Sequence, residues 1–322
     1  MKKQIGKFTI DTSITVAARI LKLVLGIGIA VVVARVLGPE GKGICALAIL
    51  LPTLLVSFGN LGIGPASVFY IGKKKYAADD ILGNSIVLAL FLGAVGSIIG
   101  LLVICFYGSV VFPNVPNLFL ILALSLVPLG LLSSFIRHVF LGLQRIGVFN
   151  FIRLLQVFVH LILVLVLLLI FKLGVAAAIA AGILAVLTAV ITALYMGKKI
   201  TGRVCLHFNG SYMKDAFTYG LKVYLGNVIG FLHYRIDMFL VNIFLDPFAV
   251  GLYSIAVVLT EKIWLVSQSA GTVLFPRVSS ETNEKRLKEF TPRVCRNILL
   301  VTFMGAILLV FVESAANCSN FL

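Results

Sequence analysis

The sequence is poor in charged residues, and poorest in acidic ones. Only 12% of its 322 residues are charged, and 27 Lys and Arg outnumber 12 Asp and Glu, whereas about 25% of an ordinary soluble domain is charged. Hydrophobic residues make up 61% of the chain and the mean hydropathy is +1.13. This composition excludes the usual soluble domain classes and predicts an integral membrane protein.

Motifs for several kinds of chemistry are also missing from the sequence. The five cysteines are scattered and form no C-x-x-C pair, so no metal or disulfide role is indicated. No G-x-x-x-x-G-K-[ST] phosphate loop is present, which argues against ATP-driven machinery. No basic segment carries a nucleic-acid-binding motif, so we expect the net charge of +15 to orient the chain and contact anionic headgroups. The first apolar segment lacks an Ala-x-Ala type cleavage site, and we expect it to stay as a membrane anchor.

Long apolar runs recur along the whole sequence. A spanning helix needs about 20 apolar residues, because the hydrocarbon core is about 30 Å thick and a helix rises about 1.5 Å per residue. The nine candidate segments are 13–35, 44–71, 81–107, 118–140, 150–172, 174–196, 217–244, 250–277 and 294–313. Strands of a membrane barrel would alternate polar and apolar residues, which these runs do not. We therefore expect an all-α polytopic membrane helix bundle with about nine transmembrane helices.

The links between these segments differ in charge. The N-terminal segment and every second link, taken with the helix ends that adjoin it, together carry 19 Lys and Arg, whereas only Arg35, Lys42 and Lys172 fall on the opposite side. Because basic loops remain in the cytoplasm, this pattern predicts a multi-pass protein whose N-terminus is cytoplasmic.

The sequence contains an internal repeat. Residues 37–51 read LGPEGKGICALAILL and residues 245–259 read LDPFAVGLYSIAVVL, with Leu, Pro, Gly and Ala recurring at a constant offset of 208. One offset holds six predicted helices, so the copies enter the membrane in the same orientation, as parallel repeats. We expect an N-terminal six-helix lobe over 1–208 and the first three helices of a second lobe over 209–322. A complete second copy would extend past Leu322, so we expect a fragment or a truncated gene.

Polar residues and glycines share one face of the predicted helix 217–244. At about 100° per residue, six of them fall within an arc of about 80°. They are Tyr219, Lys222, Gly226, Gly230, His233 and Asp237. Because charges that face lipid are costly, we expect this face to meet a water-filled cavity or a partner helix. Lys222 can alternatively snorkel to the headgroups, and His233 and Asp237 can form a structural bridge between packed helices.

The first predicted helix has a similar face about 100° wide. Its members are Asp11, Thr12, Thr15, Arg19, Lys22 and Gly26. Arg19 and Lys22 lie one to two turns from the predicted cytoplasmic end, so snorkelling is an alternative for them too.

Two other helices carry polar faces. Asn150, Arg153, Gln156 and His160 share one, and Glu261, Trp264, Gln268 and Thr272 share the other. A membrane carboxylate such as Glu261 can bind a coupling proton or Na⁺, or simply be neutralised by a neighbour such as Lys262. Asn60 falls opposite Gln268 in the repeat, and both amides can alternatively act as hydrogen-bonding links between helices.

Three phrases resemble one known family. ARVLGPEGKG, YRIDMFLVNIFLDPFAVGLYSIAVVLTEKIW and LFPRVS are similar to the polysaccharide transporter family, the lipid-linked oligosaccharide or O-antigen repeat-unit flippases of the multidrug/oligosaccharidyl-lipid/polysaccharide exporter superfamily. The resemblance covers nearly the whole chain. It implies two six-helix lobes around a central cavity that opens alternately to each side of the inner (cytoplasmic) membrane.

The family's substrates are oligosaccharides linked through pyrophosphate to a polyprenol such as undecaprenol. A pyrophosphate needs cationic donors, for which the candidates are Arg19, Lys22 and Lys222. Sugars need amide and hydroxyl partners, for which they are Asn60, Asn227, Tyr234 and Gln268. The candidates for ion coupling or gating are His233, Asp237 and Glu261.

The resemblance also sets expectations for cofactors and partners. No cofactor is implied beyond a coupling H⁺ or Na⁺. The implied partners are the polyprenyl-pyrophosphate-linked oligosaccharide, membrane lipids, and polysaccharide polymerase and chain-length proteins, with no nucleic acid.

Other functions remain open at this point. A flippase for lipid-linked peptidoglycan precursors would need the same cations. A cation-coupled drug exporter of the same superfamily would need an acidic cavity, which the excess of Lys and Arg disfavours. A membrane polysaccharide polymerase would be expected to carry a large extracytoplasmic loop, and the longest predicted outer loop, YGSVVFPNVPN, has no ionisable group apart from tyrosine. An inactive truncated remnant is the remaining alternative.

Overall fold

The computed structural model describes residues 2–112, 115–202, 209–244, 264–281 and 283–319. The side chains at 2–5, 39, 109–110, 227–228, 230–244, 284–285 and 308–319 fall outside that description. Every long regular element in the described residues is helical and none of those residues forms a strand, which confirms the predicted all-α class.

In the part of the chain that the structure describes, six helical segments are long and apolar enough to cross a membrane. They are Gly6–Gly38, Glu40–Gly59, Ala78–Gly108, Asn117–Gly142, Ile146–Ile170 and Gly174–Thr201. They correspond in order to the first six predicted spans, so this is a multi-pass membrane protein. Three more helices follow among the described residues, namely α8 (Gly210–Phe244), α10 (Trp264–Ser280) and α11 (Glu284–Ser319). Since part of the eighth predicted segment lies outside the described residues, the count of nine stays a prediction.

Glycine turns divide the first long helix, α1 (Lys2–Gly59). Gly38, with φ 71°, bends the chain between the first two spans at the predicted LGP link. The predicted helix 44–71 is wrong in one respect, because the chain breaks it at Leu61 and Gly62, whose φ values are 45° and 72°. The helix resumes as α2 (Ile63–Gly72). Only glycine adopts the left-handed region at little cost, which explains why Gly38 and Gly62 occupy these turns.

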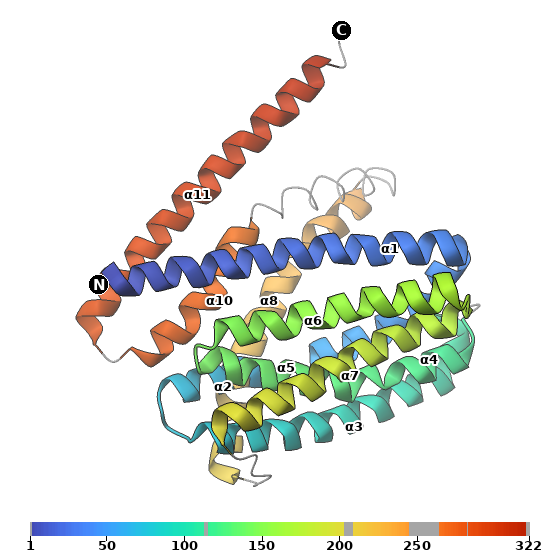
Figure 1. Cartoon of the computed structure of the whole chain (residues 1–322), viewed down its shortest axis with the longest axis horizontal. Helices are drawn as coiled ribbons and strands as arrows, with labels where there is room; N and C mark the ends of the chain where they lie inside the picture. Colours follow the sequence, from blue (N-terminus) through green and yellow to red (C-terminus); the bar gives the residue numbers. More distant parts are fainter. Residues whose placement is uncertain (1, 113–114, 203–208, 245–263, 282, 320–322) are drawn as a thin grey trace.

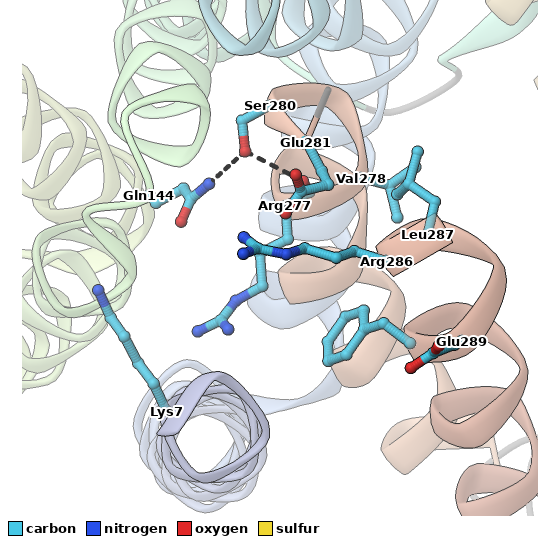
Figure 2. A pocket seen from close by; sticks show the side chains of 10 residues that line it. Lys7, Gln144, Arg277, Val278, Ser280, Glu281, Arg286, Leu287 and Glu289 are labelled. Atoms are coloured by element: carbon cyan, nitrogen blue, oxygen red, sulfur yellow. Dashed lines mark hydrogen bonds between the residues drawn. The ribbon is translucent and has the colours of Figure 1, made fainter. Parts of the chain in front are cut away.

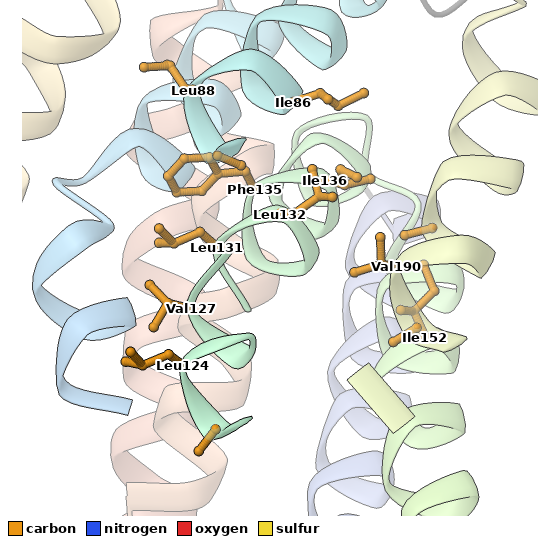
Figure 3. Close-up of a cluster of buried hydrophobic side chains, with 14 of the residues drawn as sticks. Ile86, Leu88, Leu124, Val127, Leu131, Leu132, Phe135, Ile136, Ile152 and Val190 are labelled. Atoms are coloured by element: carbon orange, nitrogen blue, oxygen red, sulfur yellow. The ribbon is translucent and has the colours of Figure 1, made fainter. Parts of the chain in front are cut away.

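The centre of the bundle is α5 (Leu126–Gly142), which continues the direction of the short α4 (Asn117–Leu124). It contacts α1, α2, α3 (Ala78–Val111), α6 (Ile146–Val164) and α7 (Gly174–Thr201). The π-helical segment η1 (Leu165–Ile170) extends α6. Phe135, Ile136 and Val139 of α5 are fully buried in the main apolar cluster, part of which Figure 3 shows.

Small residues let these helices approach closely. A Cβ atom on Gly93 of α3 would lie 2.6 Å from the Cα atom of Pro128 in α5, and one on Gly197 of α7 would lie 3.1 Å from Leu82 of α3. Close packing at small residues is the usual basis of helix association in a membrane, where no water drives apolar helices together.

The outward faces of the helices are apolar. Leu90, Phe91, Ile98 and Phe106 of α3 are each more than half exposed in the isolated chain. A soluble protein rarely exposes such a continuous apolar face, whereas lipid tails cover it at no cost. The exposure therefore supports the membrane assignment.

The C-terminal helices meet the others at one end of the bundle. α8 packs against α2, and α10 packs against α1 and α2. Figure 1 shows α11 leaving from the end where the N-terminus lies and projecting away from the bundle. A second apolar cluster joins that end, with Phe8 of α1, Val68 of α2 and Val273 of α10 among its buried members.

Candidate functional site

The polar face of α1 is divided between two partner helices. On one side the Thr15 hydroxyl accepts a 3.0 Å hydrogen bond from Nδ2 of Asn150 in α6, and both residues are buried. On the other side Asp11 and Arg19 bond to α10. The stripe predicted on the first helix is therefore a contact surface with α6 and α10 over this stretch.

Arg19 forms a fork of hydrogen bonds to α10. Its Nη1 atom donates to Oε1 of Gln268 at 3.0 Å, and Nη2 donates to the Gln268 carbonyl at 3.3 Å and to the Thr272 hydroxyl at 3.1 Å. The buried Nε atom has no partner within the described residues. Here Arg19 bonds to another helix instead of snorkelling to the headgroups. The structure thus brings together two residues to which separate roles were assigned, the pyrophosphate candidate Arg19 and the sugar candidate Gln268.

Four basic side chains inside the spans are connected by electrostatic interactions, each with at least two of the others. The positive charge of Lys22 is affected by those of Arg153, Arg137 and Arg19, and Arg153 also acts on Arg19 and Arg137. We call Arg19, Lys22, Arg137 and Arg153 the cationic cluster. Arg137 is held by a hydrogen bond to the Ser133 hydroxyl one turn earlier in α5.

The cationic cluster lacks a matching carboxylate in the six described spans. Asp11, Glu40, Asp79 and Asp80 are the acidic residues of those spans, and all lie within two turns of a span end. Asp11 is already bonded to Arg277 at 2.7 Å. Clustered cations repel one another unless an anion neutralises them, so the arrangement suits a negatively charged ligand.

Sequence reasoning missed two members of the cationic cluster as site residues. Arg137 and Arg153 were counted with the basic residues that orient the chain. A signal was available for Arg153, which shares a helix face with Asn150 and His160. Nothing in the sequence pairs Arg137 with Lys22, because their proximity arises only when α5 and α6 pack against α1.

The other predicted site residues lie apart from this cluster or beyond the description. Lys222 is exposed on α8, and the buried Oδ1 atom of Asn60 has no partner within the described residues at the break between α1 and α2. Four of these residues lie on α8, and the structure describes their backbone but not their side chains. They are Asn227, His233, Tyr234 and Asp237. Glu261 lies wholly outside them.

A separate polar and aromatic contact joins α2 to α8, and the sequence analysis did not predict it. The Asp215 carboxylate pairs with the Lys75 ammonium group and accepts a 2.7 Å hydrogen bond from the Tyr76 hydroxyl. Tyr212 is fully buried and its hydroxyl lies 3.0 Å from that of Ser67. The rings of Phe69 and Tyr219 stack with their centroids 4.5 Å apart.

The α2–α8 contact shifts the protonation of its polar groups. Hydrogen bonds from Lys75 and then Tyr76 lower the pKa of Asp215, so its carboxylate stays charged. Burial raises the pKa of Tyr212 to about 12, so this phenol stays neutral. The contact therefore combines one charged pair at its edge with a neutral, buried hydroxyl pair.

Glycine backbones complete this contact. A Cβ atom on Gly62 would lie 2.0 Å from the carbonyl oxygen of Gly220, and one on Gly220 would lie 2.7 Å from the carbonyl oxygen of Leu61. The two main chains thus touch directly, which no pair of larger residues would allow.

No metal centre is present in the described part of the chain, where no three His, Cys, Asp or Glu side chains are placed to hold an ion. The site is therefore a set of hydrogen-bond donors and positive charges at the junction of α1, α5, α6 and α10.

Comparison with known proteins gives a family and a fold. A model of the family described as polysaccharide biosynthesis protein matches residues 8–281. No significant match was found among proteins of curated function.

Solved transporters share the fold at low sequence identity. A MATE transporter in the straight conformation superposes with a TM-score of 0.74 at 15% identity, over 97% of this chain and 74% of that one. MATE transporter VcmN of Vibrio cholerae, in its bent form, gives 0.74 at 14% identity, over 98% and 76% of the two chains. A MOP superfamily transporter from Pyrococcus furiosus, reported to have a binding pocket of reverse polarity, gives 0.65 at 15% identity, over 96% and 70%.

Proposed function

The chain belongs to the polysaccharide biosynthesis protein family, and from this membership we propose that it is a flippase for undecaprenyl-pyrophosphate-linked oligosaccharide repeat units. It moves them across the inner membrane by alternating access, for assembly of a surface polysaccharide such as O-antigen, capsule or exopolysaccharide. The N-terminus faces the cytoplasm in this proposal, and the polymerase and chain-length proteins of the same process are its partners.

The observation that carries the proposal is the cationic cluster without a carboxylate inside the described spans. A pyrophosphate linkage brings two negative charges, which Arg recognises through fork-like contacts and Lys through point charge. Outward movement of two negative charges gains roughly 4–5 kcal/mol per 100 mV when the cytoplasm is negative. The membrane potential therefore favours export of such a headgroup.

In this proposal Arg19 links substrate binding to the contact between α1 and α10. Its guanidinium group is occupied by Gln268 and Thr272 in this structure. A phosphate would have to replace one or more of these bonds, after which the Gln268 amide is available to a sugar hydroxyl. Substrate binding thus loosens the link between α1 and α10, while Asn60, Asn227, Tyr234 and Lys222 supply further contacts in the proposed cavity.

Alternating access requires two bodies that move against each other. We assign these to the lobes 1–208 and 209–322. α1 and α2 contact α8 and α10, with ion pairs near the N-terminus and the basic links. In this proposal that end of the bundle faces the cytoplasm. The structure then corresponds to a state closed on the cytoplasmic side. A proton or Na⁺ at His233, Asp237 or Glu261 would reset the carrier.

A second candidate function is favoured by the fold. The MATE transporters that share it leave a drug exporter as the alternative. The reverse polarity reported for the Pyrococcus furiosus transporter indicates that interior charge varies within this fold. A cationic interior repels cationic drugs, so the cluster favours the anionic substrate. A flippase for peptidoglycan precursors shares the pyrophosphate and differs only in the sugar.

The experiment is translocation of a fluorescent undecaprenyl-pyrophosphate oligosaccharide in proteoliposomes with an imposed potential. The triple variant Arg19→Gln, Lys22→Gln, Arg153→Gln should lower the rate at least tenfold. A matched control removes three positive charges from the opposite side, by Arg35→Gln, Lys42→Gln and Lys172→Gln. It should leave the translocation rate unchanged. Unchanged transport in the first variant, or export of cationic dyes by the parent protein, would overturn the proposal. Equal transport of a peptidoglycan precursor would extend the proposed range of substrates to that lipid.

A further inference from the structure

A hollow of about 520 Å³ lies where α1, the α5–α6 turn, α10 and α11 meet. Figure 2 shows Arg277 and Arg286 extending toward it from one side and Lys7 from the other. The Gln144 amide donates a 2.7 Å hydrogen bond to the Ser280 hydroxyl at its edge. The hollow therefore draws its lining from the N-terminal and the C-terminal helices together.

The lining of this hollow carries charges of both signs. The exposed cations Lys7 and Arg286 line it together with two carboxylates, Glu281 and Glu289. Glu281 accepts a 3.1 Å hydrogen bond from the Asn283 backbone and has further acceptor capacity. Such a lining matches a ligand that carries a phosphate and a primary ammonium group close together.

A largely apolar groove continues from the hollow, with Thr9, Thr12, Ser13, Arg293, Arg296 and Asn297 as its polar lining residues. It has a volume of about 530 Å³ and lies between α1, α10 and α11. Phe290 lines both the hollow and the groove, and its ring packs edge-to-face on that of Phe8 with the centroids 5.6 Å apart. The other apolar residues of the groove are Val16, Ala17, Ile20, Val266, Ala270, Val294, Ile298 and Val301.

The length of the groove fits one leaflet of a bilayer. From Phe8 to Ile20 along α1 the helix rises about 18 Å at about 1.5 Å per residue, and one leaflet contributes about 15 Å of hydrocarbon. The charged hollow lies at the helix ends, where headgroups are found, and the groove runs inward from it. A head of mixed charge joined to an apolar chain is the structure of a phospholipid.

We propose that this composite site binds a zwitterionic aminophospholipid. Its phosphate lies against Lys7 and Arg286, its ammonium group against Glu281 and Glu289, and one acyl chain lies in the groove. A primary ammonium donates hydrogen bonds to carboxylates, whereas a quaternary choline cannot, so the site should prefer phosphatidylethanolamine to phosphatidylcholine.

The bound lipid would also favour one conformation. Lys7 lies on α1 and Gln144 in the turn between α5 and α6, whereas Ser280 lies on α10 and Arg286 and Glu289 lie on α11. A ligand that contacts both groups binds best when they are together, and it shifts the population toward that arrangement. This inference does not depend on which substrate is carried.

The test is thermal unfolding of the purified chain in detergent, titrated with dioctanoyl phosphatidylethanolamine, phosphatidylcholine or phosphatidylglycerol, or with inorganic phosphate. Phosphatidylethanolamine should raise the Tm saturably, at a half-maximal concentration at least tenfold below that of phosphatidylcholine. Equal effects of these two lipids, a stronger effect of phosphatidylglycerol, or saturation by inorganic phosphate would overturn the proposal.

Variants separate the two ends of the headgroup. Arg286→Gln should raise the half-maximal concentration for every phospholipid. Glu289→Gln should abolish the preference for phosphatidylethanolamine while leaving the response to phosphatidylcholine unchanged. The controls Lys199→Gln and Glu40→Gln remove the same charges from exposed positions that line neither the hollow nor the groove. Retention of the preference in Glu289→Gln, or equal losses in the controls, would refute the assignment.

Ala17→Phe tests the groove independently. The larger ring would occupy the space assigned to the acyl chain. We expect it to weaken binding of dioctanoyl phosphatidylethanolamine while sparing the preference for ethanolamine over choline. If this variant bound the lipid as tightly as the parent chain, the acyl-chain part of the proposal would be wrong. A loss of lipid response with intact substrate translocation would leave the proposed flippase function standing.

Discussion

Replacing Gly62 by alanine should open the contact between α2 and α8. The new Cβ atom would lie 2.0 Å from the carbonyl oxygen of Gly220, whereas real Cβ contacts essentially never fall below 3.0 Å. The two backbones must therefore separate by about 1 Å. Overpacking of this kind lowers the free energy of unfolding by roughly 1–3 kcal/mol. Alanine at φ 72° adds roughly 1–2 kcal/mol of left-handed strain.

The assay for this change is access of a thiol reagent to the contact. Ser67 is fully buried against Tyr212, so Ser67→Cys in a cysteine-free background should react slowly with a membrane-impermeant maleimide. Adding Gly62→Ala should speed the reaction at least fivefold and lower the Tm. Gly220→Ala, which meets the Leu61 carbonyl at 2.7 Å without a positive φ, should act in the same direction but less strongly.

A matched control lies on the same helix as Gly220. Gly226 has nothing within 4 Å of an added Cβ, so Gly226→Ala should leave labelling unchanged and, if anything, stabilise α8 by about 0.5–1 kcal/mol. If Gly62→Ala labelled at the rate of Gly226→Ala with an equal Tm, the close approach of the two backbones would not be what holds α2 and α8 together.

Three further changes test other contacts. Hydrogen bonds from Lys75 and Tyr76 lower the pKa of Asp215, so its charged form stabilises the fold above the unfolded pKa of about 3.9, and this effect is lost as the pH falls from there through the lower pKa of the folded state. The labelling rate of Ser67→Cys, divided by that of an exposed thiol at the same pH to cancel protonation of the thiol, should therefore rise below about pH 4. Asp215→Asn should raise labelling at neutral pH and remove this acid-dependent rise. Asp11→Asn deprives the partly buried Arg277 of its 2.7 Å carboxylate partner and should cost roughly 1–3 kcal/mol, measured as a fall in Tm, with partial recovery in the double variant with Arg277→Gln. Thr15→Val leaves Nδ2 of the buried Asn150 without its 3.0 Å acceptor and should also cost about 1–3 kcal/mol, whereas Thr15→Ser should keep most of the stability.

Each of these results has a contrary outcome. Labelling of Asp215→Asn that matches the parent at neutral pH would show that the charged pair does not hold the contact closed. Additive losses in the Asp11 and Arg277 variants would show that the two side chains act separately. A Thr15→Val variant as stable as the parent would show that the hydrogen bond from Asn150 to Thr15 contributes nothing measurable to the fold.

Much of the fold followed from local sequence signals. The long apolar runs predicted six spans that the structure contains, and the LGP link marked the bend at Gly38. The break at Leu61 and Gly62 was missed because the mean hydropathy stays high across it, although the stretch GNLGIGP carries the glycine, asparagine and proline signals of a turn. Only the φ values and the approach of Gly220 reveal why a glycine stands there.

The candidate site was only partly predictable. Arg19 and Gln268 stood out as polar residues within apolar helices, yet nothing in either helix indicated that they bond to each other. Nothing in the sequence indicates that Asp215 and Lys75 form an ion pair. They meet only because α8 packs beside the end of α2.

Composition, apolar run length and loop motifs are local properties of the chain, so the solvent, the helical class and the family could be inferred from the residues alone. The sequence also determined which side chains are costly in a bilayer. The tertiary structure decided which of those side chains share a partner, since hydrogen bonds and charge interactions act over a few ångströms between residues up to 266 positions apart in the chain. For that reason the cationic cluster, the α2–α8 contact and the composite hollow appear only when the helices are packed.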